Sequence, residues 1–109
     1  MLRKNAEVTF TENGKKLTAH IRGEIDHRGA VGIRNTIDDR LNDGGSTHLI
    51  LDLSGVDFMD SSGLGLILGR YNNAKKNGKE FSVINPSHSA ERILSAAGAS
   101  RIIKIIRQE

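Results

Sequence analysis

The sequence predicts an α/β fold built on a mixed, mostly parallel β-sheet. Three observations support this prediction. Near the N-terminus, apolar and polar residues alternate as they do in half-buried strands. From residue 28 onward, helical and strand-like patterns take turns along the chain. Strands that are joined through helices pair in parallel by right-handed crossovers, whereas the two opening strands are separated only by a tight turn. The expected order of elements is β-β-α-β-α-β-α-β.

The opening pair is expected to form an antiparallel hairpin. Apolar residues alternate with polar ones over residues 8–10 and again over residues 17–21. The stretch between them contains Asn13-Gly14, and Asn-Gly is the strongest short signal for a hairpin turn.

The next two elements are a helix and a strand. Ala30, Ile33, Ile37 and Leu41 recur at helical spacing, and glycines at positions 44 and 45 end that helix. The nearly continuous apolar run THLILDL, residues 47–53, predicts a strand buried on both faces. Residues 54–60 are expected to form a connector.

The rest of the chain repeats the pattern. Residues 61–76 predict a second helix, with Asn77-Gly78 as its C-terminal stop. FSVI at residues 81–84 predicts a strand, a third helix opens at residues 85–87 and closes at Gly98, and RIIKII at residues 101–106 predicts the last strand. We expect residues 1–109 to form a single domain, since chains of this size seldom divide.

Composition excludes several classes of function. The chain has no cysteine, which rules out disulfides, thiolate metal sites and cysteine nucleophiles. Lys and Arg number 16 against 13 Asp and Glu, but the basic clusters are short and only one Tyr and no Trp are present, so no nucleic-acid partner is expected. The N-terminus lacks an apolar leader and no run reaches membrane-spanning length, which predicts a cytoplasmic protein without a membrane partner.

The main candidate for function is DFMDSSGLG, residues 57–65. It lies just beyond the buried strand and enters a helix, at the edge of the sheet where α/β proteins usually meet ligands and partners. One interpretation is structural, with Asp60 and one of the serines capping the helix. The other is that Ser61 or Ser62 accepts a phosphate of about −1.5 to −2 charges, received by the helix dipole and its free N–H groups.

Other chemistries fit this region less well. The spacing of Gly63, Gly65 and Gly69 is one residue too long for a dinucleotide loop, so we expect these glycines to allow close packing of the helix on the sheet. Asp52 and Asp57 lie near a strand end, as in a phosphoaspartate receiver. The acidic pair after the first strand and the lysine beyond the last strand, which a receiver needs, are missing.

The histidines give no catalytic or metal site. His20, His27, His48 and His88 lack metal-ligand spacing, and no Gly-x-Ser-x-Gly motif is present. We expect His20 and His48, which fall in or at the start of strands, to be structural. The sequence therefore predicts neither an enzyme nor a resident cofactor.

A second polar segment, RGEIDHR at residues 22–28, joins a strand to a helix. It carries charges of both signs, which suits a turn with helix-capping acids. It also suits a recognition patch, because polar loops on rigid scaffolds often bind partners.

The run FMDSSGLGLILGRY, residues 58–71, resembles the signature of the anti-sigma factor antagonists, which are STAS-domain proteins of bacterial sporulation and stress switches. GEIDH at residues 23–27 and IIKII at residues 102–106 are similar to two further family segments, so the likeness spans nearly the whole chain. The Gly-Arg-Tyr at residues 69–71 points to the sporulation-type branch. The resemblance implies a STAS-like fold.

The resemblance also implies a mechanism and a site. The family's phosphorylated serine is the first after the aspartate, here Ser61. In the family, the unphosphorylated form binds an anti-sigma factor with serine kinase activity and frees a sigma factor. That kinase uses ATP to phosphorylate the antagonist, and a serine phosphatase resets it. The implied partner-binding residues are Glu24, Asp26, His27, Asp60, Ser61, Ser62 and Gly63.

Two other functions remain open at this point. STAS domains have been linked to nucleotide binding, which isothermal titration of the isolated domain with ATP and GTP would detect. A STAS domain can also serve as a regulatory module of a membrane transporter, which a neighbouring transporter gene would indicate.

Overall fold

The computed structural model describes residues 5–108 and contains the predicted succession of strands and helices. The elements are β1 (Glu7–Asn13), β2 (Lys16–Ile25), α1 (His27–Asp43), β3 (His48–Met59), α2 (Ser61–Lys76), β4 (Glu80–Ile84), α3 (His88–Ala96), the 3-10 helix η1 (Ala99–Arg101) and β5 (Lys104–Ile106). The predicted α/β class is confirmed.

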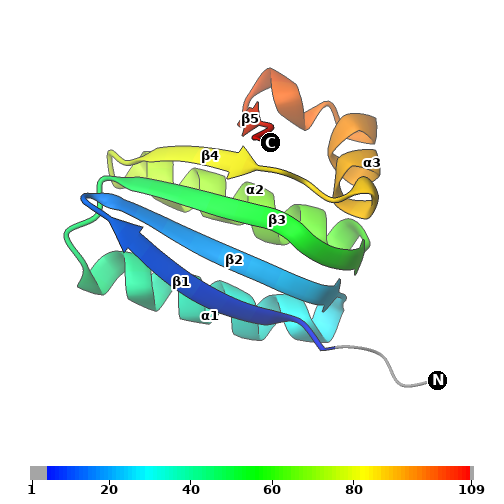
Figure 1. Ribbon diagram of the computed structural model, residues 1–109, viewed down its shortest axis with the longest axis horizontal. Helices are drawn as coiled ribbons and strands as arrows, with labels where there is room; N and C mark the ends of the chain where they lie inside the picture. The colour runs from blue at the N-terminus through cyan, green and yellow to red at the C-terminus, as the bar shows by residue number, and fades with distance from the viewer. Residues whose placement is uncertain (1–4, 109) are drawn as a thin grey trace.

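The five strands follow chain order across one sheet, β1-β2-β3-β4-β5 (Figure 1). β1 pairs antiparallel with β2, and the turn that joins them lies between Asn13 and Lys16. The other neighbouring strands pair in parallel. The opening hairpin and the mostly parallel sheet are therefore as predicted. Gly14 has a φ of +64° in this turn, a backbone conformation that suits glycine.

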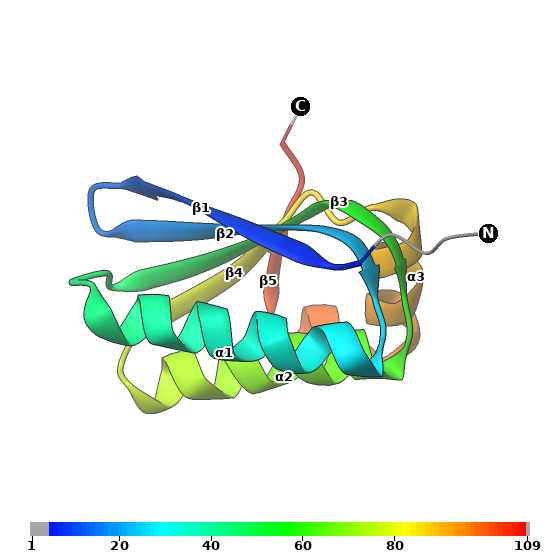
Figure 2. The ribbon, with the colours of Figure 1, turned by 90° about the horizontal axis from the view of Figure 1, so that it is seen from below.

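Helices α1 and α2 lie side by side on one face of the sheet (Figure 2). The core fills the space between them and the sheet. Helix α3 instead lies against β3 near the end of that strand. There the Ser87 amide donates to the carbonyl oxygen of Leu53 at 3.1 Å, and the Ser89 hydroxyl donates to that of Asp57 at 2.9 Å.

Strand β3 differs from its prediction in two ways. It continues to Met59, so residues 54–59 are strand rather than connector. Leu49, Leu51 and Leu53 are fully buried, but Ile50 and Asp52 between them are only half-buried. Because α1 and α2 cover one face alone, the strand is buried on one side, and the expectation of burial on both faces is wrong.

The uncovered face of the sheet carries a polar network. Nδ1 of His20 lies 2.7 Å from Oδ2 of Asp52, and Nε2 of the same ring lies 2.9 Å from Oγ1 of Thr11. Nε2 of His48 lies 3.0 Å from the hydroxyl of Ser82. Burial acts to raise the pKa of Asp52, but hydrogen bonds from His20 and Ser54 outweigh it and hold that pKa below its usual value. Both histidines thus have structural contacts, as expected.

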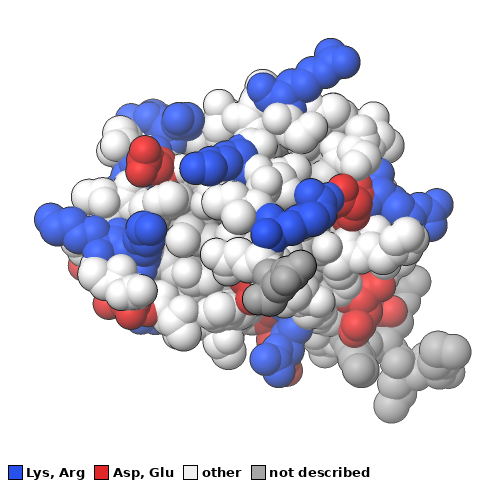
Figure 3. All heavy atoms as spheres, turned by 45° about the horizontal axis from the view of Figure 1, so that its top comes forward, with Lys and Arg blue, Asp and Glu red and all other residues white. Residues whose placement is uncertain are grey.

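One face of the molecule carries dispersed positive charge. Figure 3 shows Lys and Arg side chains scattered over one side of the molecule, with Asp and Glu among them, and no continuous basic surface.

The last strand is shorter than predicted. Only Lys104–Ile106 pair with β4, while residues 99–101 form η1. The amides of Ile102 and Ile103 donate to the carbonyl oxygen of Ala99 at 3.1 Å and 2.9 Å. These amides continue the η1 turn and are not available to a strand ladder, which explains why the apolar run does not pair along its full length.

Candidate functional site

The first residues of α1 and α2 meet at one edge of the sheet. β2 and β3 are parallel neighbours, with Glu24 opposite Phe58 and Ile25 opposite Met59. Each strand then enters its helix, so the two candidate segments of the sequence converge at the carboxyl ends of these strands. The fold itself therefore brings both predicted segments into one surface.

Both helices begin with an aspartate that caps them. Asp26 accepts a hydrogen bond from the Gly29 amide at 2.9 Å, and Asp60 accepts one from the Ser62 amide at 2.8 Å. Both aspartates have extended backbone, as N-cap residues do. The expected capping by Asp60 is confirmed, and neither serine is needed for it.

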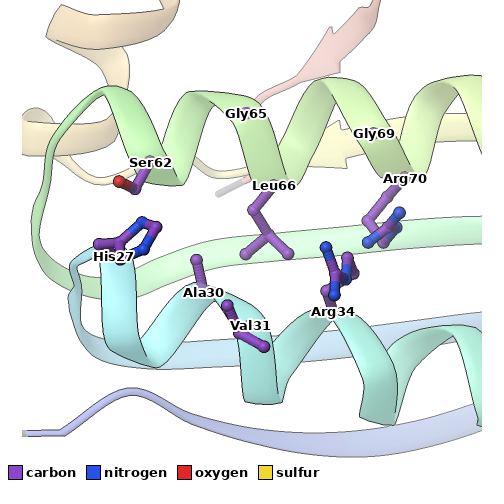
Figure 4. A pocket seen from close by; sticks show the side chains of 9 residues that line it. All are labelled: His27, Ala30, Val31, Arg34, Ser62, Gly65, Leu66, Gly69 and Arg70. Atoms are coloured by element: carbon purple, nitrogen blue, oxygen red, sulfur yellow. The ribbon is translucent and has the colours of Figure 1, made fainter.

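The two serines have different surroundings. Ser61 is the exposed first residue of α2. Ser62 is half-buried and lines a groove between α1 and α2, across from His27 (Figure 4). A macromolecular partner can reach Ser61 more easily than Ser62.

The amides of the first turn of α2 are already occupied. Ser62 donates to the Asp60 carboxylate, and Gly63 and Leu64 donate to the Asp60 carbonyl oxygen at 3.0 Å and 3.2 Å. The expectation that free N–H groups would receive a phosphate here is therefore wrong for these three amides. A group attached to the exposed Ser61 would extend toward solvent, near the positive end of the helix dipole and the adjacent Asp60 carboxylate.

Gly63 holds α2 close to the sheet. A Cβ at this position would lie 2.8 Å from the Cβ of Met59 and 3.4 Å from Cγ2 of Ile25. A Cβ at Gly65 or Gly69 would meet nothing within 4 Å. The prediction that the three glycines serve close packing holds for Gly63 and is wrong for the other two.

The remaining predicted residues lie near the same edge of the sheet. His27 is the exposed first residue of α1, and Glu24 is half-buried in β2 beside Phe58. The structure thus places the seven predicted residues near the carboxyl ends of β2 and β3, with Gly63 buried.

Phe58 lies at the same edge of the sheet but was not among the predicted site residues. Its side chain is 46% exposed, although it follows a mostly buried strand. It borders a groove of about 450 Å³ together with Met59, Ser89, Arg92, Ile93 and Ala96. The sequence contains no usable signal for it, because the alternation of strand residues between opposite faces applies to Phe58 and Met59 only once this segment is known to be strand.

The described residues form neither a metal-binding cluster nor a membrane-spanning helix. Within residues 5–108, no group of three or more His, Asp or Glu side chains is arranged to hold a metal ion. In the same range, no helix is both long enough and apolar enough to cross a membrane.

Comparison with known proteins identifies the fold family. Residues 5–109 match the family model of the STAS domain. The anti-sigma factor antagonist SpoIIAA shares the fold: its unphosphorylated form aligns with a TM-score of 0.80 at 24% identity, over 94% of this chain and 89% of that chain. Its phosphorylated form, described as a Bacillus cell fate determinant, aligns with a TM-score of 0.75 at 24% identity, over 94% and 92% of the two chains. The chain therefore belongs to the STAS-domain family.

A curated relative defines the family more narrowly. The chain is 31% identical over 105 residues to the anti-sigma F factor antagonist of Paenibacillus polymyxa, which covers 96% of this chain and 90% of that protein. Within the STAS family, the chain is thus a member of the anti-sigma factor antagonists, as the resemblance predicted. The name of this relative also agrees with the sporulation-type branch.

Proposed function

We propose that the unphosphorylated chain binds an anti-sigma factor that is also a serine kinase, and so frees a sigma factor in the cytoplasm. The kinase then uses ATP to phosphorylate Ser61, which ends the interaction, and a serine phosphatase restores the original state. The chain itself catalyses no reaction in this cycle. The observation that carries the proposal is the exposed Ser61 at the start of α2, beside the start of α1.

Exposure favours Ser61 over Ser62 as the target. A protein kinase must hold the target hydroxyl in line with the γ-phosphate of ATP, so that hydroxyl has to reach outside its own protein. Ser61 is exposed, whereas Ser62 is half-buried at the groove between α1 and α2.

The surroundings of Ser61 suit a switch that acts at the surface. A phosphate would add about −1.5 to −2 charges. The Asp60 carboxylate is adjacent, and the three amides that follow Ser61 are occupied. The new charge would therefore face the partner while the fold stays largely unchanged.

Repulsion is then sufficient to release the partner. Like charges brought together across an interface cost several kcal/mol. Since about 1.4 kcal/mol corresponds to a tenfold change in affinity, a phosphate facing the nucleotide phosphates of a kinase lowers affinity by orders of magnitude without refolding.

Bait proteins in host lysate test this proposal. The Ser61→Ala and Ser61→Asp variants are used with ATP or ADP, and captured proteins are identified by mass spectrometry. We expect the alanine variant to retain an ATP-binding serine kinase that the aspartate variant loses. Capture of the same proteins by both variants, or of no kinase by either, contradicts the proposal.

The captured kinase then permits a matched control. With radiolabelled ATP it should phosphorylate the wild-type chain and Ser62→Ala but not Ser61→Ala. Radiolabel on Ser61→Ala would show that the kinase phosphorylates a residue other than Ser61. Circular dichroism of each variant verifies that α2 is retained.

A further inference from the structure

Helices α1 and α2 enclose a groove of about 310 Å³ that extends away from the Ser61 surface (Figure 4). His27 and Ser62 lie at the end where the helices begin, and Arg34 and Arg70 lie farther along. Small or apolar residues line the rest: Ala30, Val31, Gly65, Leu66 and Gly69. An apolar cavity of this size with a few polar groups is typical of sites for small ligands.

Arg70 is an unusual residue in this lining. It comes from an otherwise largely apolar part of α2, and its side chain is only 8% exposed. Its Nε lies 3.0 Å from Oδ1 of Asp38. The same oxygen accepts a hydrogen bond from the side-chain nitrogen Nδ2 of Asn73 at 3.2 Å. Nη1 of Arg70 is buried and makes no hydrogen bond within the part of the chain that the structure describes. Buried N–H donors in proteins nearly always have a hydrogen-bond acceptor, so a donor without one indicates that a bound molecule supplies the acceptor.

Arg34 adds a second guanidinium. It is exposed on α1, and Figure 4 shows the nitrogen-bearing ends of Arg34 and Arg70 facing one another across the groove. Burial lowers the pKa of Arg70, Asp38 opposes that effect, and Arg34 adds to it. Two guanidiniums and one carboxylate leave a single net positive charge, which matches a singly charged anion.

The glycines keep the groove open. A Cβ at Gly65 or Gly69 would meet nothing within 4 Å, so space remains between the helices at both positions. The fork of an arginine fits the two oxygens of a carboxylate, and apolar side chains beside it can contact a short hydrocarbon chain.

We propose that the groove between α1 and α2 binds a small organic monocarboxylate. Its carboxylate lies between Arg34 and Arg70, and its apolar body lies along Leu66, Gly65 and Ala30. This ligand site shares His27 and Ser62 with the predicted partner-binding residues but does not depend on Ser61.

Isothermal titration of the full chain with butyrate tests the site. We expect saturable binding to the wild-type chain, weakened at least about tenfold in Arg34→Gln because a charge-assisted hydrogen bond is lost. Gly65→Leu should abolish binding by filling the groove. Arg28→Gln is the matched control, because Arg28 is an exposed arginine of α1 that does not line this groove. Thermal unfolding of each variant verifies that it is folded.

The outcomes separate the possible occupants. Saturable butyrate binding that is lost in Arg34→Gln and Gly65→Leu, but kept in Arg28→Gln and Ser61→Ala, supports the proposal. Absence of saturation, or equal binding by wild type and both groove variants, overturns it. Inorganic phosphate that binds as tightly as butyrate also overturns it, since the groove would then recognise charge and not an organic acid.

Discussion

At the scale of single residues, Asp26 and Asp60 perform the same task at neighbouring positions. Each directly follows a strand, adopts extended backbone and accepts a hydrogen bond from the first turn of the next helix. Since β2 and β3 are adjacent and parallel, these two caps fix where both helices of the functional surface begin. The position of Ser61 is a direct result, because it is the residue after the second cap.

Removing the second cap should destabilise the protein. Asp60→Ala leaves the Ser62 amide without its carboxylate acceptor, and we expect the free energy of unfolding to fall by about 1 kcal/mol. Urea unfolding measures this loss. Asp60→Ser, which keeps a capping oxygen, should recover most of it, and an unchanged stability of Asp60→Ala would contradict the capping role.

Two glycines of α2 should respond in opposite directions to the same substitution. Gly63→Ala places a Cβ 2.8 Å from the Cβ of Met59, and we expect a loss of about 1–3 kcal/mol from overpacking. Gly65→Ala meets open space, so it should gain about 0.5–1 kcal/mol from helix propensity. Urea unfolding of both variants decides this, and shifts of the same sign would argue against the packing described for Gly63.

At the scale of elements, the pattern of apolar residues predicted the order of the elements and the limits of α2, residues 61–76. It could not predict that β3 continues through residues 54–59, because Ser54-Gly55 has the composition of a turn. Pairing with β2 keeps this segment extended, with Gly55 opposite Arg22 and register shifts in the ladder on either side. Such pairing is a contact between distant parts of the chain, which local composition does not encode.

The same limit applies to the candidate site. Asp26, Asp60 and Ser61 could be found because capping and sequence motifs are local. The arginines of the groove between α1 and α2 were missed, since nothing in either helix alone indicates that Arg34 and Arg70 face each other.

Gly23, at the irregular part of β2, should be sensitive to substitution. Gly23 has a φ of +94°, and a Cβ there would lie 2.4 Å from the carbonyl oxygen of Asn5. Gly23→Ala should therefore lower the free energy of unfolding by more than about 1 kcal/mol. Gly14→Ala is the matched control, with a φ of +64° but open space around the new Cβ, and should cost less. Equal losses in urea unfolding would show that crowding at Asn5 is unimportant.

At the scale of the whole molecule, the sheet has one face covered by α1 and α2 and one face that carries polar contacts. Those contacts depend on ionisation. The pKa of Asp52 lies below its usual value, so its carboxylate stabilises the fold fully above the unfolded pKa of about 4, and this contribution is lost as pH falls through the lower folded pKa.

Asp52→Asn should reveal this dependence. At pH 7 we expect the variant to be less stable than wild type by about 1–2 kcal/mol, because it loses a charge-assisted contact with His20. The difference should shrink as pH falls below about 4, where wild type also loses the charge. Urea unfolding across this pH range measures it, with the exposed Asp39→Asn as control. A constant difference at all pH values would contradict an ionic contribution.

The chain-order arrangement of the strands has a consequence for the kind of signal this molecule can carry. Doubly wound folds bind cofactors at a topological switch point, a crevice that opens where successive helices leave the sheet toward opposite faces. Here β2, β3 and β4 follow one another without reversal, and α1 and α2 stay on the same face. The connectivity thus provides no topological switch point among β2, β3 and β4. What it presents at the carboxyl ends of β2 and β3 is a pair of adjacent helix starts, a surface that another protein can touch and that one covalent charge can alter.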